Sequence, residues 1–523
     1  MTKGPSPLID TVVIGNGPAA LILSYLLHGH VPYYTTLNPH FDPLLHRKLQ
    51  GQPCLLDLDI NRLTQHFLAS RFSYSTQTLP LNVLLDTLVR PHSDTDLLDT
   101  KTCVEWKHKP EKAVPHIILG NASEAGGQWT ENPPDTSEDI EALSYSEMLS
   151  LPGYSFAEHY QQEEGRLLQP FTRPTRRQLA QYYATYPTMV GIDDCIYNSN
   201  QVSGVSRSSK GFFISSHNIH CKHIVLASGI FSSFIPPPPM LRPLFSLTPP
   251  TPGSGTLLIV GSGFSAADVI LSTPTNQKII HIYRWAPNEQ PSPLKSCHRQ
   301  AYPDYALIYR LMKLAAPSSS SVNDGRRPKL TKKTSKPMTG ERIHRERYEG
   351  LPNATIAGIA VEGDSATICI KKDDGSYIQR QINKFSYDIG RRGSLGYLEP
   401  QLLEEVLPPI QGPRDTEDYI SGQTLRAKSY NSIEMAPNVF AVGSLTGDTL
   451  VRYAYGSCVS AAGSIMTRSS GQQERRKKHP YTNANGTTTA SPIFQLTKAM
   501  AKPVAHVELG KAPKIPKARS CQR

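Results

Sequence analysis

Two segments of the chain share one order of apolar and small residues. Residues 10–27 begin with a β-branched run that ends at Gly15, and an apolar stretch with helical spacing follows at once. Residues 256–268 repeat this order around Gly261. A buried strand, a glycine turn and an apolar helix in direct succession are typical of a dinucleotide-binding unit. The pattern therefore predicts an α/β fold with two Rossmann-like dinucleotide-binding domains.

The first glycine turn has the residue types that hold a pyrophosphate. Gly15 permits the tight turn, Gly17 lets the backbone approach the ligand, and Ala20 takes the place of a third glycine where helix meets strand. Pro18 opens the helix, whose N-terminal amides favour negative charge. We expect all four residues to contact a cofactor, although a strand–helix unit without a ligand would show the same pattern.

The expected ribose contact of this unit is unusual. A Rossmann unit commonly places an acidic residue about 20 positions after the turn. Here residues 33–37 form the next strand-like run, which ends at Asn38, and the nearest acid is Asp42. Either Asn38 binds the ribose more weakly than a carboxylate, or the adenosine is held in another way.

The second glycine turn indicates a phosphorylated nicotinamide nucleotide. Gly261 and Gly263 stand in the two glycine positions, and Ser265 and Ala266 follow in the first turn of the helix. The next strand-like run ends at Arg284, where an NAD site would have a carboxylate. A guanidinium can pair with the 2′-phosphate of NADP, so we predict NADPH here. The alternative is that Arg284 is an ordinary surface residue.

Near the end of the ordered pattern, residues 438–448 form a strand that leads into a turn. Gly443 lies in this turn and Asp448 ends it. The carboxylate of Asp448 can bond the ribityl chain of a flavin, with the helix over 455–466 aimed at the ring system. The alternative is that Asp448 serves only the turn. Two nucleotide sites would let a nicotinamide meet a flavin face to face.

The length of 523 residues allows two or three domains. We expect a first domain over 1–245 and 386–466, and an inserted second domain over 246–385 with a basic loop at 317–336. Residues 467–523 hold nearly all of the net charge of +11, with few large apolar residues, and predict a disordered basic tail. Such a tail is a localisation signal or a contact for anionic partners, or it is simply solvated.

The spacing of the cysteines and histidines and the length of the apolar runs argue against a metal site, a dithiol centre and a membrane span. The eight cysteines contain no Cys-x-x-Cys pair, which argues against a zinc site or a dithiol redox centre, and we predict no metal. His217, His220 and His223 would not share one face of a strand. No apolar run approaches the roughly 18 residues of a membrane span, and residues 1–5 lead directly into a strand without room for a signal peptide. We therefore expect a soluble, cytoplasmic protein.

The complete pattern resembles the oxidative stress-induced growth inhibitor family, within the flavin-containing monooxygenase superfamily, over about residues 8–466. The segments that carry this resemblance are 12–18 (VVIGNGP), 42–50 (DPLLHRKLQ), 106–109 (WKHK), 114–120 (VPHIILG), 126–129 (GGQW), 151–154 (LPGY), 261–268 (GSGFSAAD), 302–305 (YPDY) and 443–452 (GSLTGDTLVR). The resemblance implies FAD on the first unit, NADPH on the second, and reaction with molecular oxygen. It also implies that Gly126, Gly127, Gln128 and Trp129 line the flavin side.

The chain departs from the superfamily at two places. The Phe-x-Gly-x-x-x-His fingerprint is not matched, because Gly153 and His159 are two residues too far apart. The asparagine that monooxygenases place shortly before a stretch like residues 146–148 is also absent, and Leu143 and Ser144 stand there instead. Compared with the superfamily pattern, the chain therefore looks complete in its cofactor-binding segments and altered in its oxygenating contacts.

These observations lead to two main hypotheses. The first is an FAD-dependent, NADPH-using oxidoreductase of the flavin monooxygenase type, with an unknown small-molecule substrate and no catalytic residue that the sequence assigns. The alternative is a flavoprotein scaffold or redox sensor that regulates growth or differentiation with little substrate oxygenation. A nucleic-acid-binding regulator is a third hypothesis, and it rests only on the basic tail and loop.

Overall fold

The computed structural model describes residues 8–64, 78–91, 101–131, 136–247, 255–316, 346–408 and 419–478. The predicted basic loop at 317–336 and the part of the predicted tail from residue 479 lie outside the described residues. Within them, no helix combines the length and the apolar character needed to cross a membrane.

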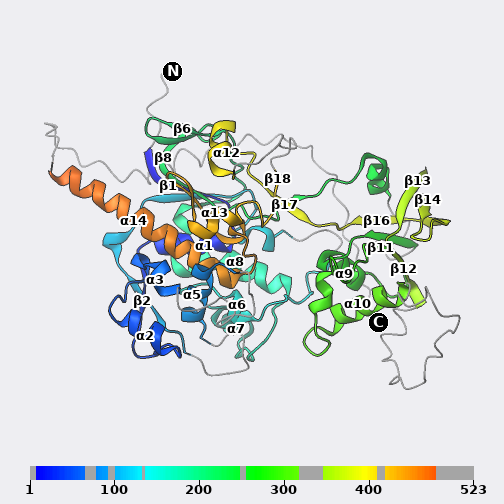
Figure 1. Cartoon of the computed structure of the whole chain (residues 1–523), viewed down its shortest axis with the longest axis horizontal. Coiled ribbons are helices and arrows are strands. Elements are labelled where there is room, and N and C mark those ends of the chain that lie inside the picture. The colour runs from blue at the N-terminus through cyan, green and yellow to red at the C-terminus, as the bar shows by residue number, and fades with distance from the viewer. Residues whose placement is uncertain are drawn as a thin grey trace, which may run out of the picture.

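The first domain is built on an eight-stranded, mostly parallel sheet (Figure 1). Its centre is β1 (Leu8–Ile14), which pairs in parallel with β8 (Ile219–Leu226) on one side and β4 (His116–Leu119) on the other. Side chains alternate across the sheet, so that Val13 packs against one layer while Val12 and Ile14 pack against the other. The remaining strands are β5 (Ile196–Tyr197), β6 (Val205–Ser208), β7 (Gly211–Ile214), β19 (Glu434–Ala436) and β20 (Val439–Ala441).

The helical layer of this domain centres on α1 (Pro18–Leu27), which leaves the first glycine turn. All but its first two residues are buried, because α14 (Ala454–Lys478), α8 (Arg176–Val190) and the sheet enclose it. The other helices of the domain are α2 (Pro43–Gln50), α3 (Ile60–Thr64), α5 (Pro80–Val89), α6 (Ser146–Leu149), α7 (Phe156–Glu164), α12 (Pro400–Val406) and α13 (Arg426–Asn431).

The strand that we expected to follow α1 within the sheet lies elsewhere. It is β2 (His30–Tyr34), and it pairs antiparallel with β3 (Val104–His108) in a separate two-stranded sheet. The neighbour of β1 on this side is β4 instead, so residues 28–115 separate α1 from the second strand of the Rossmann unit. The periodicity of β2 is that of a strand, but periodicity does not reveal the partner of a strand.

The second domain has a parallel four-stranded sheet in the order β12-β11-β10-β16. These strands are β10 (Thr256–Val260), β11 (Lys278–Tyr283), β12 (Tyr348–Pro352) and β16 (Lys384–Tyr387), with α9 (Phe264–Ser272) and α10 (Pro303–Ala315) packed on it. A meander of β13 (Thr355–Glu362), β14 (Ser365–Lys371) and β15 (Tyr377–Ile382) completes it.

The chain enters and leaves the second domain through adjacent strands. β9 (Ser233–Phe234) precedes the domain, and β17 (Arg391–Ser394) follows it and pairs antiparallel with β9. β17 also pairs with β18 (Tyr419–Ile420). Figure 1 shows this narrow connection between the two sheets, with α9 and α10 on the side of the second. The second dinucleotide-binding unit is thus an insertion between two segments of the first.

The C-terminal helix corrects the expected start of the tail. We predicted disorder from residue 467, whereas α14 continues to Lys478. Arg468 pairs with Glu434 at 2.8 Å, and the Ser469 hydroxyl donates to Asp10 Oδ1 at 3.0 Å. These contacts attach the helix to the outer strand β19 and to the central strand β1 of the first sheet, which composition alone does not reveal.

Candidate functional site

A pocket opens over the first glycine turn, at the carboxyl ends of β1 and β8. It is the place where doubly wound sheets bind nucleotides. Of the predicted cofactor contacts, eight meet here: Gly15, Gly17, Pro18, Gly127, Gln128, Trp129, Gly443 and Asp448. Gly126 precedes this loop directly, and Ala20 lies fully buried beneath the pocket, where it packs the helix.

The two glycines of the turn have different tasks. Gly15 has φ of +112°, and a Cβ there would lie 2.5 Å from the carbonyl oxygen of Ala227. Gly17 has an ordinary φ of −78°, and a Cβ there would meet nothing within 4 Å. Gly15 is therefore required by the fold, whereas Gly17 leaves open space in front of the N-terminal amides of α1, where an anionic group could approach them.

Asn16 connects the turn to the loop after β4. Its side-chain amide donates to the carbonyl oxygens of Ala122 and Glu124 and to Asn198 Oδ1, at 2.8 to 3.2 Å. Its own carbonyl accepts from the backbone N–H of Gly126 at 2.8 Å. The turn and the loop therefore form one hydrogen-bonded unit.

The loop of Gly126 to Trp129 closes one side of the pocket. Both glycines have positive φ, and a Cβ on Gly127 would lie 3.0 Å from the Cα of Gly17, so the two turns touch through backbone. The Trp129 ring lies 6.0 Å from that of Tyr183 on α8. Opposite, Gly443 has φ of +64°, and a Cβ there would lie 2.6 Å from that of Ala19.

Asp448 lines the pocket, but protein groups already hold its carboxylate. Arg426 Nη1 donates to Oδ1 at 2.6 Å, while Asn82 Nδ2 and the backbone N–H of Leu79 donate to Oδ2 at 2.7 and 3.0 Å. These bonds join the last turn of the first domain to the start of α5. Asp448 thus forms a structural ion pair with Arg426 at the wall of the pocket. Its three donors fix the orientation of the carboxylate, and with it the direction in which the oxygens can accept further hydrogen bonds.

Asn38 lies apart from this site, and the expectation built on it is corrected. Its strand β2 is outside the main sheet, its side chain donates to the carbonyl of Thr102 at 3.2 Å, and it is not among the residues that line the pocket. The position that follows the second strand of the Rossmann unit is occupied by Gly120 and Asn121, and Asn121 does line the pocket. Sequence reasoning missed Asn121 because it assigned the second strand to residues 33–37.

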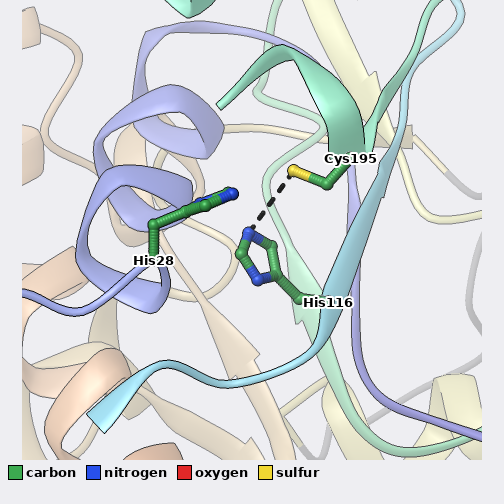
Figure 2. A group of neighbouring side chains, drawn as sticks. All are labelled: His28, His116 and Cys195. Atoms are coloured by element: carbon green, nitrogen blue, oxygen red, sulfur yellow. Dashed lines mark hydrogen bonds between the residues drawn. The ribbon is translucent and has the colours of Figure 1, made fainter. Parts of the chain in front are cut away.

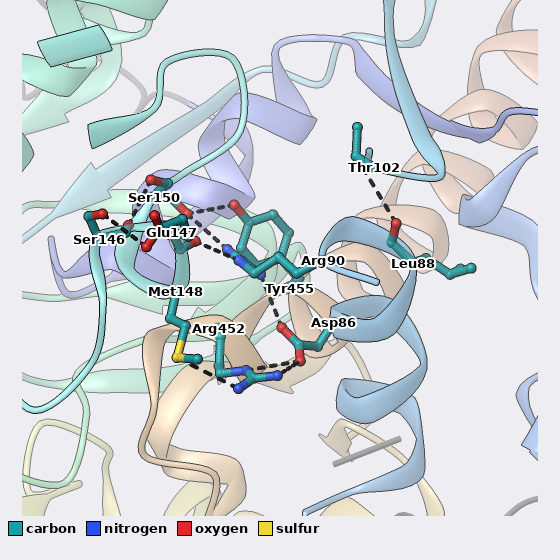
Figure 3. A network of polar contacts seen from close by, with 10 residues as sticks. All are labelled: Asp86, Leu88, Arg90, Thr102, Ser146, Glu147, Met148, Ser150, Arg452 and Tyr455. Atoms are coloured by element: carbon teal, nitrogen blue, oxygen red, sulfur yellow. Dashed lines mark hydrogen bonds and ion pairs between the residues drawn. The ribbon is translucent and has the colours of Figure 1, made fainter. Parts of the chain in front are cut away.

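A buried charge cluster lies behind the pocket (Figure 3). The carboxylate of Asp86 receives hydrogen bonds from Arg452, and from Arg90 at 3.1 Å, and all three side chains are at most 9% exposed. Arg90 also donates to the carbonyls of Glu147 and Ser150, and its guanidinium lies over the ring of Tyr455. The cluster ties α5, α6 and the start of α14 together, directly after the pocket residues Leu450 and Val451.

The second glycine turn borders a cavity between the domains. A Cβ on Gly261 would lie 2.4 Å from the carbonyl oxygen of Asp388, whereas one on Gly263 would meet nothing within 4 Å. As in the first turn, the first glycine is therefore required by the fold and the second leaves open space. Ser265 lines the cavity, and Ala266 is buried against Gly261.

The interdomain cavity shares a wall with the first pocket. Four residues line both spaces: Gln128, Trp129, Phe231 and Arg391. Arg176 adds a second cation to the cavity, and Phe234, Phe245, Phe264 and Phe385 supply apolar surface. Ligands in the two spaces would therefore approach each other at Trp129 and Phe231.

Arg284 lies at the end of β11, as the sequence predicted, but it does not line this cavity. It is exposed, and its Nη1 donates to Gln290 Oε1 at 2.6 Å. Asp268 of α9 does line the cavity. Burial raises the pKa of Asp268 to about 6, although the Tyr305 hydroxyl, which donates to it at 2.7 Å, opposes this rise.

Comparison with known proteins gives the following relatives. No family model matches the chain. It is 26% identical to oxidative stress-induced growth inhibitor 1 of Mus musculus, with 88% of this chain and 95% of that protein covered. It is 24% identical to oxidative stress-induced growth inhibitor 2 of Homo sapiens, with 93% and 97% covered. The oxidative stress induced growth inhibitor homolog of Caenorhabditis elegans is 30% identical over 148 residues, which cover 28% of this chain and 30% of that protein.

Among solved structures, the chain is similar to a flavin-containing monooxygenase from Stenotrophomonas maltophilia, with a TM-score of 0.47 and 14% identity, covering 88% of this chain and 99% of that one. It is also similar to the bacillithiol disulfide reductase Bdr of Bacillus cereus, with a TM-score of 0.47 and 12% identity, covering 88% and 100%.

Proposed function

The chain belongs to the oxidative stress-induced growth inhibitor family, and we propose that this member is an oxidoreductase that binds FAD in the first pocket and NADPH in the second domain. With both bound, these cofactors would supply transfer of a hydride from NADPH to FAD and reoxidation of the flavin by molecular oxygen. The observation that carries this proposal is the shared wall of Gln128, Trp129, Phe231 and Arg391, because it lets two nucleotides meet at one point.

The first pocket fits a dinucleotide. Gly17 leaves space in front of the α1 amides for a pyrophosphate, and Gly127 and Gly443 bring two further backbone segments to the same place without side chains in between. In this proposal Asn121, at the end of the second sheet strand, would bond a ribose hydroxyl. Asp448 would orient the ribityl chain, with Arg426 and Asn82 holding its carboxylate in place. These residue types bind sugars and phosphate without needing a metal.

The second domain supplies the corresponding cradle for NADPH. Gly263 keeps the approach to α9 open, and Ser265 follows at the first turn of that helix. We assign Arg284 to the 2′-phosphate, because its guanidinium is exposed at the end of β11, where it can exchange Gln290 for a phosphate. Arg176 and Arg391 give the cavity positive charge that complements the pyrophosphate.

When bound, FAD supplies the chemistry of accepting a hydride and passing electrons to oxygen. The role of the protein is to orient the two nucleotides and to exclude water from the place where they meet. Trp129 and Phe231 form the apolar meeting point of the two spaces, and the Gly126 loop that carries Trp129 is fixed to Asn16. The buried Asp86 cluster holds the turn that leads from the pocket into α14.

The proposal is tested by reconstituting the protein with FAD and following NADPH oxidation in air. We expect one FAD per chain and a preference for NADPH over NADH. Replacing Arg284 with Ala should raise the KM for NADPH at least about tenfold, with little effect on NADH, because one charge-assisted contact of about 1.5 to 3 kcal/mol is lost. The matched control is Arg299→Ala, at another exposed arginine of the same domain. Equal use of both nucleotides, unchanged in Arg284→Ala, would refute the assignment of Arg284.

A second candidate function is a flavoprotein scaffold or redox sensor that regulates growth. The observation that favours it is the altered oxygenating region: Leu143 stands where monooxygenases place an asparagine, and its carbonyl accepts from the Tyr302 hydroxyl at 2.9 Å. This hydrogen bond links the two domains, and Leu143 has no side-chain amide that could contact the ligands. Such a protein would bind FAD and be reduced by NADPH, but it would not release an oxygenated product from a panel of amines and sulfides.

A further inference from the structure

Three side chains that are distant in sequence converge at the end of α1 that lies away from the first pocket. His28 follows the last residue of α1, His116 is the first residue of β4, and Cys195 ends the short helix η4 (Asp193–Cys195). Their ligating atoms lie within 4.8 Å of one another (Figure 2). From this geometry we propose that His28, His116 and Cys195 form a binding site for Zn²⁺.

The distances are close to those of a tetrahedral zinc site. Zn–N bonds of about 2.0 Å and Zn–S bonds of about 2.3 Å place a nitrogen and a sulfur ligand about 3.5 Å apart. His116 Nε2 and Cys195 Sγ are 3.5 Å apart. Both side chains are buried, so they are held in place. His28 is the ligand that would have to move closer, because the three ligating atoms lie only within 4.8 Å of one another, and its side chain is 22% exposed at the surface.

Both histidines present the correct nitrogen. His116 Nδ1 lies 2.7 Å from the carbonyl oxygen of Val114, and His28 Nδ1 lies 2.8 Å from that of Ser24. A carbonyl only accepts, so each Nδ1 carries a proton. His116 Nε2 faces the Ser24 hydroxyl and keeps a lone pair, whereas His28 Nε2 faces the Asp194 carboxylate and offers its lone pair once it carries no proton. A backbone carbonyl on the second ring nitrogen is the usual support of a zinc-binding histidine.

A carboxylate lies at the edge of the cluster. His28 Nε2 is 3.2 Å from Asp194 Oδ1, which places an anionic oxygen next to the proposed ligands. A divalent ion at the cluster would draw on both groups, and Asp194, which is mostly exposed, can supply the fourth ligand in place of a water. The Ser24 hydroxyl lies 2.9 Å from His116 Nε2, 3.3 Å from Cys195 Sγ and 3.4 Å from His28 Nδ1, so it must rotate out of the space between the three ligands when the metal enters.

Binding involves a simple exchange of a proton. The Cys195 thiol loses its S–H proton to solvent, and the thiolate then forms the sulfur–metal bond, with no change in oxidation state. The site would fix α1 to β4 and η4 at the base of the first domain, about 15 Å from the glycine turn, since α1 has ten residues. Its role is therefore structural and separate from the proposed flavin chemistry.

The test is a titration of the metal-stripped, flavin-free full chain with Co²⁺, followed by displacement with Zn²⁺. We expect one Co²⁺ per chain, a thiolate-to-cobalt absorption band, release of a proton, and a higher midpoint of thermal unfolding. Cys195→Ser should abolish the band. His28→Ala should weaken binding at least about tenfold, because even the loss of a supporting residue behind a ligand costs 10–100-fold. The matched controls Cys297→Ser and His298→Ala, in the second domain, should bind as the unaltered chain does.

Several results would overturn the proposal. These are no stoichiometric Co²⁺ binding by the unaltered chain, a thiolate band that persists in Cys195→Ser, and a band that is lost in Cys297→Ser. If Cys195→Ser does not fold, the His28→Ala variant provides the test, because His28 is partly exposed. Unchanged Co²⁺ affinity in His28→Ala would then overturn the proposal. Because flavin is absent throughout, a negative result here leaves the proposed oxidoreductase function untouched.

Discussion

Replacing Gly17 with Ala is the perturbation that best separates the fold from its proposed ligand. The backbone of Gly17 has φ of −78° and ψ of 178°, which any residue adopts without strain. An added Cβ would meet nothing within 4 Å in the protein. The methyl group would instead occupy the space in front of the α1 amides, where the pyrophosphate of FAD is proposed to lie.

Opposing effects on stability nearly cancel. An alanine at a compatible position stabilises by about 0.4–1 kcal/mol through the unfolded chain. Alanine at the residue before a helix is less favourable than glycine by about 0.5–1 kcal/mol. The free energy of unfolding should therefore change by less than about 1 kcal/mol. A phosphate oxygen must come within about 2.9 Å of an amide nitrogen to bond it, and a methyl group in that space prevents this approach. We expect FAD affinity to fall at least about 100-fold, or about 2.7 kcal/mol.

The assay combines urea unfolding of the flavin-free protein with a titration of FAD fluorescence. Gly15→Ala is the matched control, because the same change there forces φ of +112° and a contact of 2.5 Å with backbone. That variant should lose stability, by at least about 1–3 kcal/mol from the strained φ alone. If Gly17→Ala binds FAD as tightly as the unaltered chain, the pyrophosphate does not lie at this turn and the reasoning fails.

The remaining predictions concern other parts of the molecule. Gly263→Ala should leave FAD binding intact and abolish reduction by NADPH, since the Cβ enters only the second cradle; stopped-flow absorbance measures both. Asp86→Asn should lower the free energy of unfolding in urea by about 3–5 kcal/mol, because it leaves Arg452 and Arg90 buried without their charge partner. Glu405→Gln, at the exposed pair with Arg207, should lower it by less than about 1 kcal/mol. Equal effects of the two changes would contradict this. Burial raises the pKa of Asp268 from 3.8 to about 6, so the folded state holds this proton longer than the unfolded state and stability falls as pH rises from about 4 to about 6. Asp268→Asn should remove that fall and stabilise the protein at pH 7 by up to about 3 kcal/mol, and a pH series of unfolding curves that is parallel for both proteins would count against it.

The parts of the fold that follow from local pattern were predictable. Both strand–glycine–helix units lie where the order of apolar and small residues placed them, because each depends on a few adjacent residues. The pairing of strands was not. The run at 30–34 has the composition of a strand, but only the tertiary structure shows that β4 rather than β2 lies beside β1. This one difference explains why Asn38 was chosen and Asn121 was missed.

Contacts between remote segments set the remaining limits. Residues 467–478 have the composition of a solvated tail, yet Arg468 and Ser469 find partners on the first sheet and the helix continues. His28, His116 and Cys195 were missed as a cluster because their spacing matches no local metal motif, and three elements of the fold bring them together. Asp448 lines the pocket, but its ion pair with Arg426 depends on a side chain from another helix, which the local pattern does not reveal.

The most direct test of the account is anaerobic mixing of the FAD-loaded protein with NADPH, and with NADPH deuterated at the transferred position, while flavin absorbance is recorded. The account predicts that the flavin bleaches, that deuterium slows the bleaching, and that absorbance returns when oxygen is admitted. A flavin that dithionite reduces but NADPH does not would contradict it, because the two nucleotides would then not meet at the wall formed by Trp129 and Phe231.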